Sequence, residues 1–361
     1  MSEPPFLAQA RFAGANRPVV YTDRGDCLMK TVADWQLAHP GPRHPAKWTN
    51  ATWYRGLIEL AKLDSTGGYW EKLRAIGEGL DWKPQDNIFH ADDLGIGYAF
   101  LECHRKFGDP RMLQGIKDRL DYIIANRATA PLDEGPQEEN KRWWWADALY
   151  MAPPTLVILH RITGDAKYIE FMDEEWWTTT EHLYDKEDHL FFRDARFLNS
   201  IREADGRKMF WSRGNGWVIG ALTHVLSEMP ADFPNRPRYV QLFREMTARL
   251  VALQPADGVW RASLLNPEGF PVPEASGSVF HTFALAWGLN NGLLDPAVFA
   301  EPLRKAWNGI VGLVRPDGML GNVQQIGGRP QPTQPDQTQE YAVGGLLLAA
   351  AEIHRLAGQI A

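Results

Sequence analysis

Residues 141–177 read KRWWWADALYMAPPTLVILHRITGDAKYIEFMDEEWW, and they contain the clearest helical pattern of the chain. Its apolar part, ALYMAPPTLVILHRI, leads through Gly164 and Asp165 into a more polar amphipathic segment. Glycine just after one helix and aspartate at the N-cap of the next are typical helix boundaries. The stretch therefore predicts a helical hairpin with one helix in a crowded interior and its partner outside.

The same arrangement recurs along the chain. Segments rich in aromatic or small apolar residues begin near Trp53, Leu94, Ala148, Trp217, His281 and Tyr341. Some lead through a similar Gly-Asp step into a second helix, as in FGDPRMLQGIKDRLDYIIA. We therefore expect an all-α fold, a closed (α/α)6 toroid of six helical hairpins that forms one domain over residues 1–361. An open helical array or an irregular bundle is the alternative.

Smaller features fit between these hairpins. Glycines on the inner helices would permit close packing of their backbones; they are Gly56, Gly97, Gly220, Gly288, Gly344 and Gly345. The short stretches HLFFRDARF and KMFWSRG predict small β-hairpins at one mouth of the barrel. The run GGRPQPTQPDQTQ, residues 327–339, predicts a loop at that mouth before the last inner helix.

Composition narrows the class of function. The chain has 361 residues, a net charge of -7 and a pI near 5.8, which argues against a nucleic-acid-binding surface. A few local arginines can still bind an anionic substrate inside an acidic protein. The 15 tryptophans are unusually many for this length, so indole serves either a bulky core or a surface on which sugar rings stack.

Cofactor and targeting signals are missing from the sequence pattern. Cys27 and Cys103 could pair, but they form neither a disulfide framework nor a zinc site. We expect no metal and no cofactor. The N-terminal MSEPPFLAQARFAG lacks a basic and then apolar leader, and no run of about 18 apolar residues occurs. We expect a cytoplasmic protein, or a periplasmic one if a signal peptide has been removed, without nucleic-acid or membrane partners, as a monomer or weak homodimer.

Asp147 is the first candidate for chemistry. It stands alone among aromatic and apolar side chains in KRWWWADALYMAPP. Desolvation there would raise the pKa of its carboxyl toward the value that a general acid needs near neutral pH. The alternative is a buried aspartate that anchors a helix or pairs with an arginine.

Asp92 and Asp93 form the second candidate, in HADDLGIG. Acidic residues at the start of a helix can simply cap it, but capping needs only one of the two. The other would then be available for chemistry. A metal site at His90, Asp92 and Asp93 is disfavoured, because no second histidine or glutamate cluster accompanies them.

Two further segments complete the inventory. In WSRGNGW, Arg213 could bind a carboxylate bidentately while Trp211 or Trp217 stacks on the sugar ring, or it could pair with a structural aspartate. The loop 264–278, LLNPEGFPVPEASGS, either lines the pocket or buttresses it. Carboxylates, an arginine and many aromatic faces fit a carbohydrate site, and the arginine indicates an acidic sugar.

These motifs resemble a known family. WWWADALYMAPP, RITGDAKY, LYDKEDHLFFRDARF, WSRGNGW and the SLLNPEGFPVPEASG loop are similar to glycoside hydrolase family 105, the unsaturated rhamnogalacturonyl hydrolases, and more distantly to the unsaturated glucuronyl hydrolases of family 88. The resemblance covers nearly the whole chain. It implies an (α/α)6 barrel that removes a 4,5-unsaturated uronic acid from the non-reducing end of oligosaccharides left by polysaccharide lyases, by acid/base hydration of the double bond.

The resemblance also implies roles for single residues. Asp147 matches the family's catalytic aspartate, the general acid/base. The second aspartate falls on Asp92 or Asp93, with a slight preference for Asp93 and with Asp92 then contacting substrate. Arg213 and Trp217 match the residues that hold the uronate carboxylate and ring. The remaining residues expected to bind substrate are His90, Trp48, Trp145 and Trp211.

Two segments depart from the family pattern. Family members have a histidine where this chain has Arg193 and Asp194, and a glycine-rich, histidine-containing segment where it has DEGPQEENKR, residues 133–142. Both regions could contact the leaving sugar. The reaction type therefore carries over better than the preference for rhamnose, and an aglycone from ulvan or another uronate-containing glycan is possible.

Other functions remain as alternatives. An (α/α)6 epimerase would be expected to use paired histidines, which the sequence does not obviously supply, and a polysaccharide lyase is a further possibility. A non-catalytic carbohydrate-binding protein is the alternative from another class. The presence of both Asp147 and the Asp92–Asp93 pair argues against it, because binding alone needs no acid embedded in indole.

Overall fold

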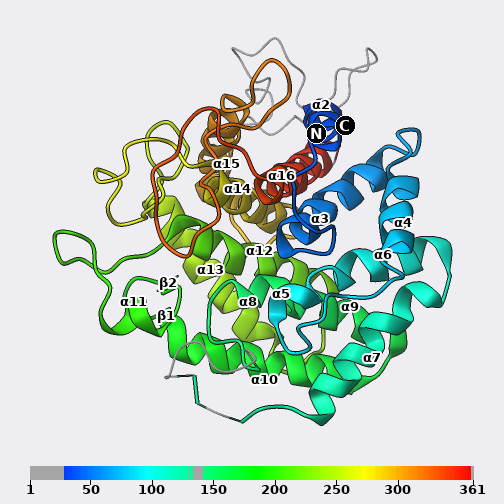
Figure 1. Ribbon diagram of the computed structural model, residues 1–361. Helices are drawn as coiled ribbons and strands as arrows, with labels where there is room; N and C mark the ends of the chain where they lie inside the picture. The colour runs from blue at the N-terminus through cyan, green and yellow to red at the C-terminus, as the bar shows by residue number, and fades with distance from the viewer. Residues whose placement is uncertain (1–27, 130, 133–140, 359–361) are drawn as a thin grey trace.

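The structure is a computed structural model that describes residues 28–129, 131–132 and 141–358 (Figure 1). An inner set of helices surrounds its centre. This set comprises α3 (Trp48–Leu63), α6 (Gly97–Phe107), α9 (Pro153–Thr163), α12 (Ser212–Glu228), α14 (Ala275–Asn290) and α16 (Glu340–Gly358). Each packs against the next, and α16 packs back against α3. The ring is therefore closed, which confirms the expected toroid and excludes an open array.

A second set of helices packs outside the first. It comprises α4 (Tyr69–Gly79), α7 (Arg111–Ala125), α10 (Ala166–Leu183), α13 (Arg236–Ala252) and α15 (Pro296–Val311), each behind the inner helix that precedes it. The outer partner of α16 is α2 (Leu28–Ala38), which comes from the other end of the chain. Five pairs are thus sequential hairpins, as expected, while closure of the ring assembles the sixth from both ends (Figure 1).

Local sequence sets the turns between paired helices. Gly164 ends α9 at a φ of 73°, in the left-handed region where a side chain is strained. Asp165 then caps α10, because its Oδ1 accepts a hydrogen bond of 3.1 Å from the backbone N–H of Lys167. At the corresponding step, Gly108 ends α6 and Asp109 accepts a hydrogen bond from the backbone N–H of Arg111, although Pro110 occupies the N-cap position of α7.

The ring closes through direct contact between two backbones. A Cβ atom at Gly56 of α3 would lie 2.4 Å from the carbonyl oxygen of Gly344 on α16. A Cβ at Gly344 would lie 2.4 Å from the carbonyl oxygen of Thr52. Glycine is therefore required on both helices, and the first and last inner helices meet without side chains between them.

Two inner helices are interrupted, where the sequence predicted continuous ones. The single turns α5 (Ala91–Leu94) and α8 (Ala148–Met151) precede α6 and α9. Pro153 and Pro154 cause the second break, because neither has a backbone N–H to donate to the preceding turn. The helix α12 begins at Ser212, so that the WSRGNGW motif forms its first turns.

The expected hairpins at the mouth are only partly present. The strands β1 (Tyr184–Asp185) and β2 (Leu190–Phe191) pair antiparallel, with Tyr184 opposite Phe191. The following RDARF residues form the short helix α11 (Ala195–Asn199), capped by Asp194, instead of extending the strand. KMFWSRG contributes isolated bridges at Lys208 and Trp211. Residues 327–339 form an irregular loop before α16, as predicted.

The cysteines and the lengths of the apolar helices bear on redox state and on membrane insertion. Cys103 is buried on α6 as a free thiol, and Cys27 lies outside the described residues. None of the helices in the described part of the chain combines the length and apolarity that a bilayer span requires.

Candidate active site

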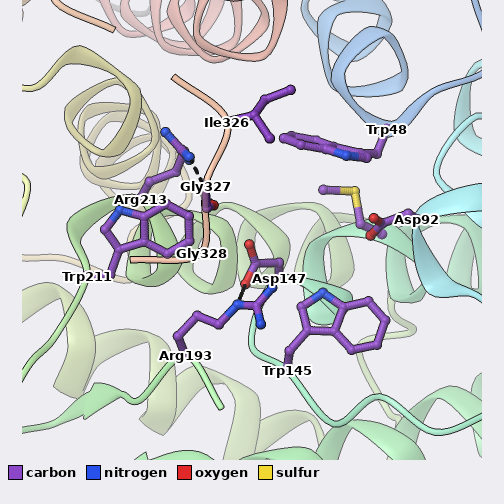
Figure 2. A pocket seen from close by; sticks show the side chains of 11 residues that line it. Trp48, Asp92, Trp145, Asp147, Arg193, Trp211, Arg213, Ile326, Gly327 and Gly328 are labelled. Carbon is purple, nitrogen blue, oxygen red and sulfur yellow. Dashed lines mark hydrogen bonds and ion pairs between the residues drawn. The ribbon is translucent and has the colours of Figure 1, made fainter. Parts of the chain in front are cut away.

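The N-terminal ends of the inner helices meet at one mouth of the barrel and surround a pocket of about 230 Å³ (Figure 2). This convergence follows from the fold, because every inner helix runs in the same direction. The pocket is lined by Trp48, Asp92, Trp145, Asp147, Met151, Arg193, Trp211, Arg213, Ile326, Gly327 and Gly328. Segments distant in the sequence thus contribute two carboxylates, two guanidinium groups and three indoles to one site.

Asp147 points into this pocket from the start of α8 (Figure 2). It occupies the N-cap position, yet its side chain caps nothing. Its Oδ2 lies 3.3 Å from Nε of Arg193, an ion pair in which neither atom makes a hydrogen bond to the described residues. Burial raises the pKa of the Asp147 carboxyl, although the charges of Arg193 and Arg213 oppose that shift. The site therefore favours a protonated acid, as the sequence predicted.

Asp92 also lines the pocket, from the single turn α5. Burial and the negative charges of Asp147 and Asp93 raise the pKa of its carboxyl to about 7. The charge of Asp147 thus adds to the effect of burial on Asp92, and burial raises the pKa of both carboxyl groups. The pocket therefore holds one carboxyl group with a pKa near neutral pH and a second whose pKa is also raised.

Asp93 faces away from this pair, contrary to the slight preference that the sequence gave it. It is buried, and its Oδ2 accepts a hydrogen bond of 3.1 Å from the backbone N–H of Asn87. Successive residues on one helical turn point in different directions, so only one of the two aspartates can reach the cavity. The structure makes Asp92 the pocket carboxylate and Asp93 an anchor for the loop before α5.

Arg213 lies against the pocket, but both of its Nη atoms donate to protein groups, and only its buried Nε has no hydrogen-bond partner among the described residues. Its Nη1 donates to the carbonyl oxygen of Gln324 at 2.8 Å and to Oγ of Ser276 at 3.3 Å. Its Nη2 donates to the carbonyl oxygens of Gln325 and Gly327 at 3.1 and 3.4 Å. The residue has no solvent-exposed surface. Arg213 therefore holds residues 324–327 in place, and the expected bidentate grip on a substrate has no free Nη donor.

Glu274 supports the same loop from the opposite side. It caps α14 by accepting hydrogen bonds of 2.8 Å from the backbone N–H groups of Ser276 and Gly277. The same carboxylate accepts a hydrogen bond of 3.1 Å from the N–H of Gln324. The loop 264–278 thus buttresses the pocket through Glu274, which was one of the two possibilities left by the sequence.

The expected aromatic residues divide between the pocket and its support. Trp48, Trp145 and Trp211 line the cavity. Trp217 does not, because it is buried beneath, with its ring centroid 6.0 Å from Trp48 and 4.9 Å from Tyr150. A glycine-rich helix start lets neighbouring helices approach so closely that they cover this indole. Trp217 supports the floor of the pocket rather than stacking on a ligand.

His90 is likewise a supporting residue. Its Nδ1 accepts a hydrogen bond of 3.2 Å from the backbone N–H of Asp92 and so caps α5. Its ring packs edge-on against Trp145 at 5.2 Å. Burial lowers the pKa of His90, which favours the neutral ring that this acceptor role requires. The residue fixes Asp92 and Trp145 without lining the pocket itself.

Arg193 is a pocket residue that the sequence marked only as a departure from a family pattern. The backbone N–H of Ala146 donates to the carbonyl oxygen of Arg193 at 2.8 Å, and Trp145 forms a β-bridge with Asp194. These contacts join the segment after β2 to the segment that carries Asp147. An arginine following three successive buried apolar residues, Leu190, Phe191 and Phe192, was the available signal, but the pairing across the mouth could not be deduced from it.

One group of carboxylates in the described part of the chain has cation-binding spacing, and it lies outside the pocket. It consists of Asp185, Glu187 and Asp188, around the β1–β2 turn. The Nζ atom of Lys208 lies 2.8 Å from Asp185 and Glu187 and 3.1 Å from Asp188. This ammonium group and Arg249, whose Nη2 lies 2.7 Å from Asp188, offset most of the negative charge of the three carboxylates. The segment 133–140, expected beside the leaving sugar, lies outside the described residues.

Known proteins resemble this chain over nearly its full length. The family described as Glycosyl Hydrolase Family 88 matches residues 20–357. A relative from Formosa agariphila, an unsaturated 3S-rhamnoglycuronyl hydrolase, is 38% identical over 92% of this chain and 90% of its own.

Two solved structures share the fold closely. A polysaccharide lyase superposes with a TM-score of 0.84 and 29% identity over 92% of this chain and 97% of the other. A family 88 glycosyl hydrolase from Bacteroides vulgatus superposes with a TM-score of 0.83 and 27% identity, over 91% and 97%.

Proposed function

Since the chain belongs to glycosyl hydrolase family 88, we propose that it hydrolyses unsaturated uronic acid oligosaccharides. The enzyme releases a 4,5-unsaturated uronic acid from the non-reducing end of fragments left by polysaccharide lyases. The observation that carries this proposal is the pairing of Asp147 with Asp92 in one indole-lined pocket, both with a raised pKa. Such a pair supplies a proton at neutral pH and takes one back.

The reaction follows from the substrate's enol ether. Protonated Asp147 donates its proton to C4 of the C4=C5 bond, and positive charge develops at C5 and the ring oxygen. Water adds its oxygen to C5 and returns a proton to Asp147. The resulting hemiketal opens and expels the aglycone, so no carboxylate attacks C1 as in ordinary glycoside hydrolysis.

Asp92 takes the second role in this scheme. Its carboxyl shares protons with Asp147 and accepts hydrogen bonds from the sugar's hydroxyl groups. We assign Asp93 a structural part instead, because its carboxylate already accepts from the backbone of Asn87. Trp48, Trp145 and Trp211 provide the apolar faces against which the ring lies.

The aglycone is inferred from the relatives. The Formosa agariphila protein is named for a rhamnoglycuronyl substrate. We propose that this chain likewise cleaves the bond between the unsaturated uronate and a rhamnose.

Ultraviolet absorbance tests the reaction. The conjugated C4=C5 bond of the substrate absorbs, and the enzyme should remove that absorbance from lyase digests of rhamnose-containing glycuronans. Digests of pectin and of glycosaminoglycans serve as comparisons that rank the aglycones. A lack of absorbance loss with every digest would refute the proposed reaction.

A polysaccharide lyase is the second candidate, because a solved structure of that name superposes with a TM-score of 0.84. The same assay distinguishes the lyase from the hydrolase by the direction in which the absorbance changes. A lyase creates the double bond and raises the absorbance of an intact polysaccharide, whereas the hydrolase lowers that of a lyase product.

A further inference from the structure

We infer that Arg193 binds the carboxylate of the unsaturated uronate, in place of the more deeply buried Arg213. The inference rests on the proposed function, since it names the group that recognises that substrate's charge. A uronate in a pocket already holding two aspartates needs a cation that offers two donors along one edge; Arg213 has an unpartnered Nε, but its Nη2 donates to carbonyl oxygens. Among the described residues that line the pocket, the cations are Arg193 and Arg213.

Exposure and hydrogen bonding separate these two arginines. Arg213 is completely buried, and both of its Nη atoms donate to Ser276 or to backbone carbonyls of residues 324–327. Freeing them would release the loop that covers the pocket. The side chain of Arg193 keeps 16% of its surface exposed, in the cavity that Figure 2 shows. A ligand can therefore reach Arg193 without any rearrangement of the backbone.

Asp194 fixes the orientation of Arg193 and leaves one edge open. Nη1 of Arg193 donates to Oδ2 of buried Asp194 at 2.7 Å. The opposite edge carries Nε and Nη2. Nε faces Asp147 at 3.3 Å without a hydrogen bond, and Nη2 donates to none of the described residues.

A neighbouring arginine shows what this edge can hold. Nε and Nη2 of Arg196 both donate to the carboxylate of Asp194, at 2.9 and 2.8 Å. This is the bidentate geometry in which guanidinium groups bind carboxylates most strongly. Arg193 presents the same pair of donors toward the cavity, so a uronate carboxylate can occupy them in the same way.

Gly328 lies over the face of the same guanidinium group. A Cβ atom there would lie 3.6 Å from Cζ, 3.7 Å from Nε and 3.8 Å from Nη2 of Arg193, which is ordinary contact with the face of the group. The backbone of the loop therefore packs on this face and leaves the edge with Nε and Nη2 turned toward Asp147 and the cavity.

The net charge of Arg193, Arg196 and Asp194 favours the binding of an anion. Arg193 and Arg196 share one carboxylate, Asp194, whose pKa these partners lower despite its burial. One positive charge remains, and an ionised Asp147 would balance it. When Asp147 carries the proton that catalysis requires, the uronate can balance that charge instead. Substrate binding at Arg193 therefore favours the protonated form of Asp147, because its nearest cation is then shared with a second anion.

A double-mutant cycle between protein and ligand tests the contact. The first pair of ligands is an unsaturated disaccharide with a free carboxylic acid and its methyl ester, for which kcat/KM is measured. The second pair is a saturated glucuronide and its methyl ester, for which binding is measured by calorimetry and so does not depend on turnover. For the wild type we expect the acid to be favoured roughly 10- to 100-fold, the range for a hydrogen bond to a charged group. In Arg193→Gln this preference should fall to about one, and Arg193→Lys should give an intermediate value.

Arg196→Gln is the matched control. It removes a positive charge from the same Asp194, but its side chain is 53% exposed and does not line the pocket. It should keep the wild-type preference for the acid. If Arg193→Gln folds and still prefers the acid as strongly as the wild type, Arg193 does not bind the carboxylate. Failure of the proposed function would appear differently, as no turnover of any unsaturated substrate while the binding cycle still reports on Arg193.

Discussion

Arg55 donates hydrogen bonds to two backbone carbonyls at the end of α8, that of Tyr150 at 2.8 Å and that of Met151 at 3.2 Å. Those carbonyls lack helical donors, because Pro154 has no N–H and the N–H of Thr155 turns to Ala152. The buried guanidinium thus completes the helix turn that begins at Asp147.

Replacing this arginine should destabilise the protein. Arg55→Met keeps the length of the side chain but leaves two buried carbonyls without donors, at a cost of about 1–3 kcal/mol each. We expect a clear fall in the thermal midpoint, measured by circular dichroism. Arg74→Met removes a half-exposed arginine from the surface and should leave the midpoint nearly unchanged.

Asp147→Asn should abolish turnover while preserving the fold. The amide cannot donate a carboxylic proton to C4 at neutral pH, so we expect kcat to fall by about 10²–10⁴-fold. Binding of the unsaturated disaccharide, measured by calorimetry, should persist. A variant that retains most of its kcat would remove Asp147 from the chemistry.

Adjacent aspartates should respond differently to the same substitution. Asp92→Asn should lower kcat strongly without weakening the fold, because this carboxyl faces the cavity and, among the described residues, anchors no backbone group beyond α5. Asp93→Asn should mainly weaken the fold, since its charged acceptor anchors the backbone of Asn87. Kinetics and thermal melts on both proteins decide the assignment. Loss of kcat confined to Asp93→Asn would restore the sequence-based preference.

The pKa of Asp92, about 7, predicts how stability depends on pH. In an unfolded chain an aspartate has a pKa of about 4. Between these values the folded protein binds more protons than the unfolded one, so the contribution of this group to the free energy of unfolding decreases as pH rises from about 4 to about 7. Urea unfolding at pH 5 and pH 8 should show a smaller difference for Asp92→Asn than for wild type. An equal difference would contradict the raised pKa.

Backbone contact between α3 and α16 makes a steric prediction. Gly56→Ala would place a methyl group 2.4 Å from the carbonyl oxygen of Gly344, so the two helices must separate. We expect a large loss of thermal stability. Gly79→Ala is the control, because a Cβ at this position at the end of α4 meets nothing within 4 Å and should be neutral or slightly stabilising. Equal midpoints for the two variants would show that the helices can part without cost.

The sequence predicted the features that depend on local pattern. Apolar periodicity and the Gly164–Asp165 boundary were sufficient for the helical hairpins, and the isolation of Asp147 among indoles predicted an acid with a raised pKa. Both follow from residues that are neighbours along the chain.

Features that depend on contacts between residues far apart in the chain could not be predicted from the sequence. Which of Asp92 and Asp93 faces inward depends on the rotation of one short turn. Arg213 appeared free because its acceptors, the carbonyls of residues 324–327, lie more than 100 positions away and carry no side-chain signal. Arg193 is placed at the pocket by a β-bridge between Trp145 and Asp194, which no local sequence pattern predicts.

The contact between Gly56 and Gly344 also has a consequence for biosynthesis. During translation α3 is synthesised early, but the side of α3 that contacts α16 stays uncovered until α16 has emerged from the ribosome. Nascent chains that still lack α16 would expose this apolar side of α3 and need shielding by chaperones. Because residues 324–328 also emerge just before α16, catalytic competence should arrive abruptly at the end of translation rather than accumulate with chain length.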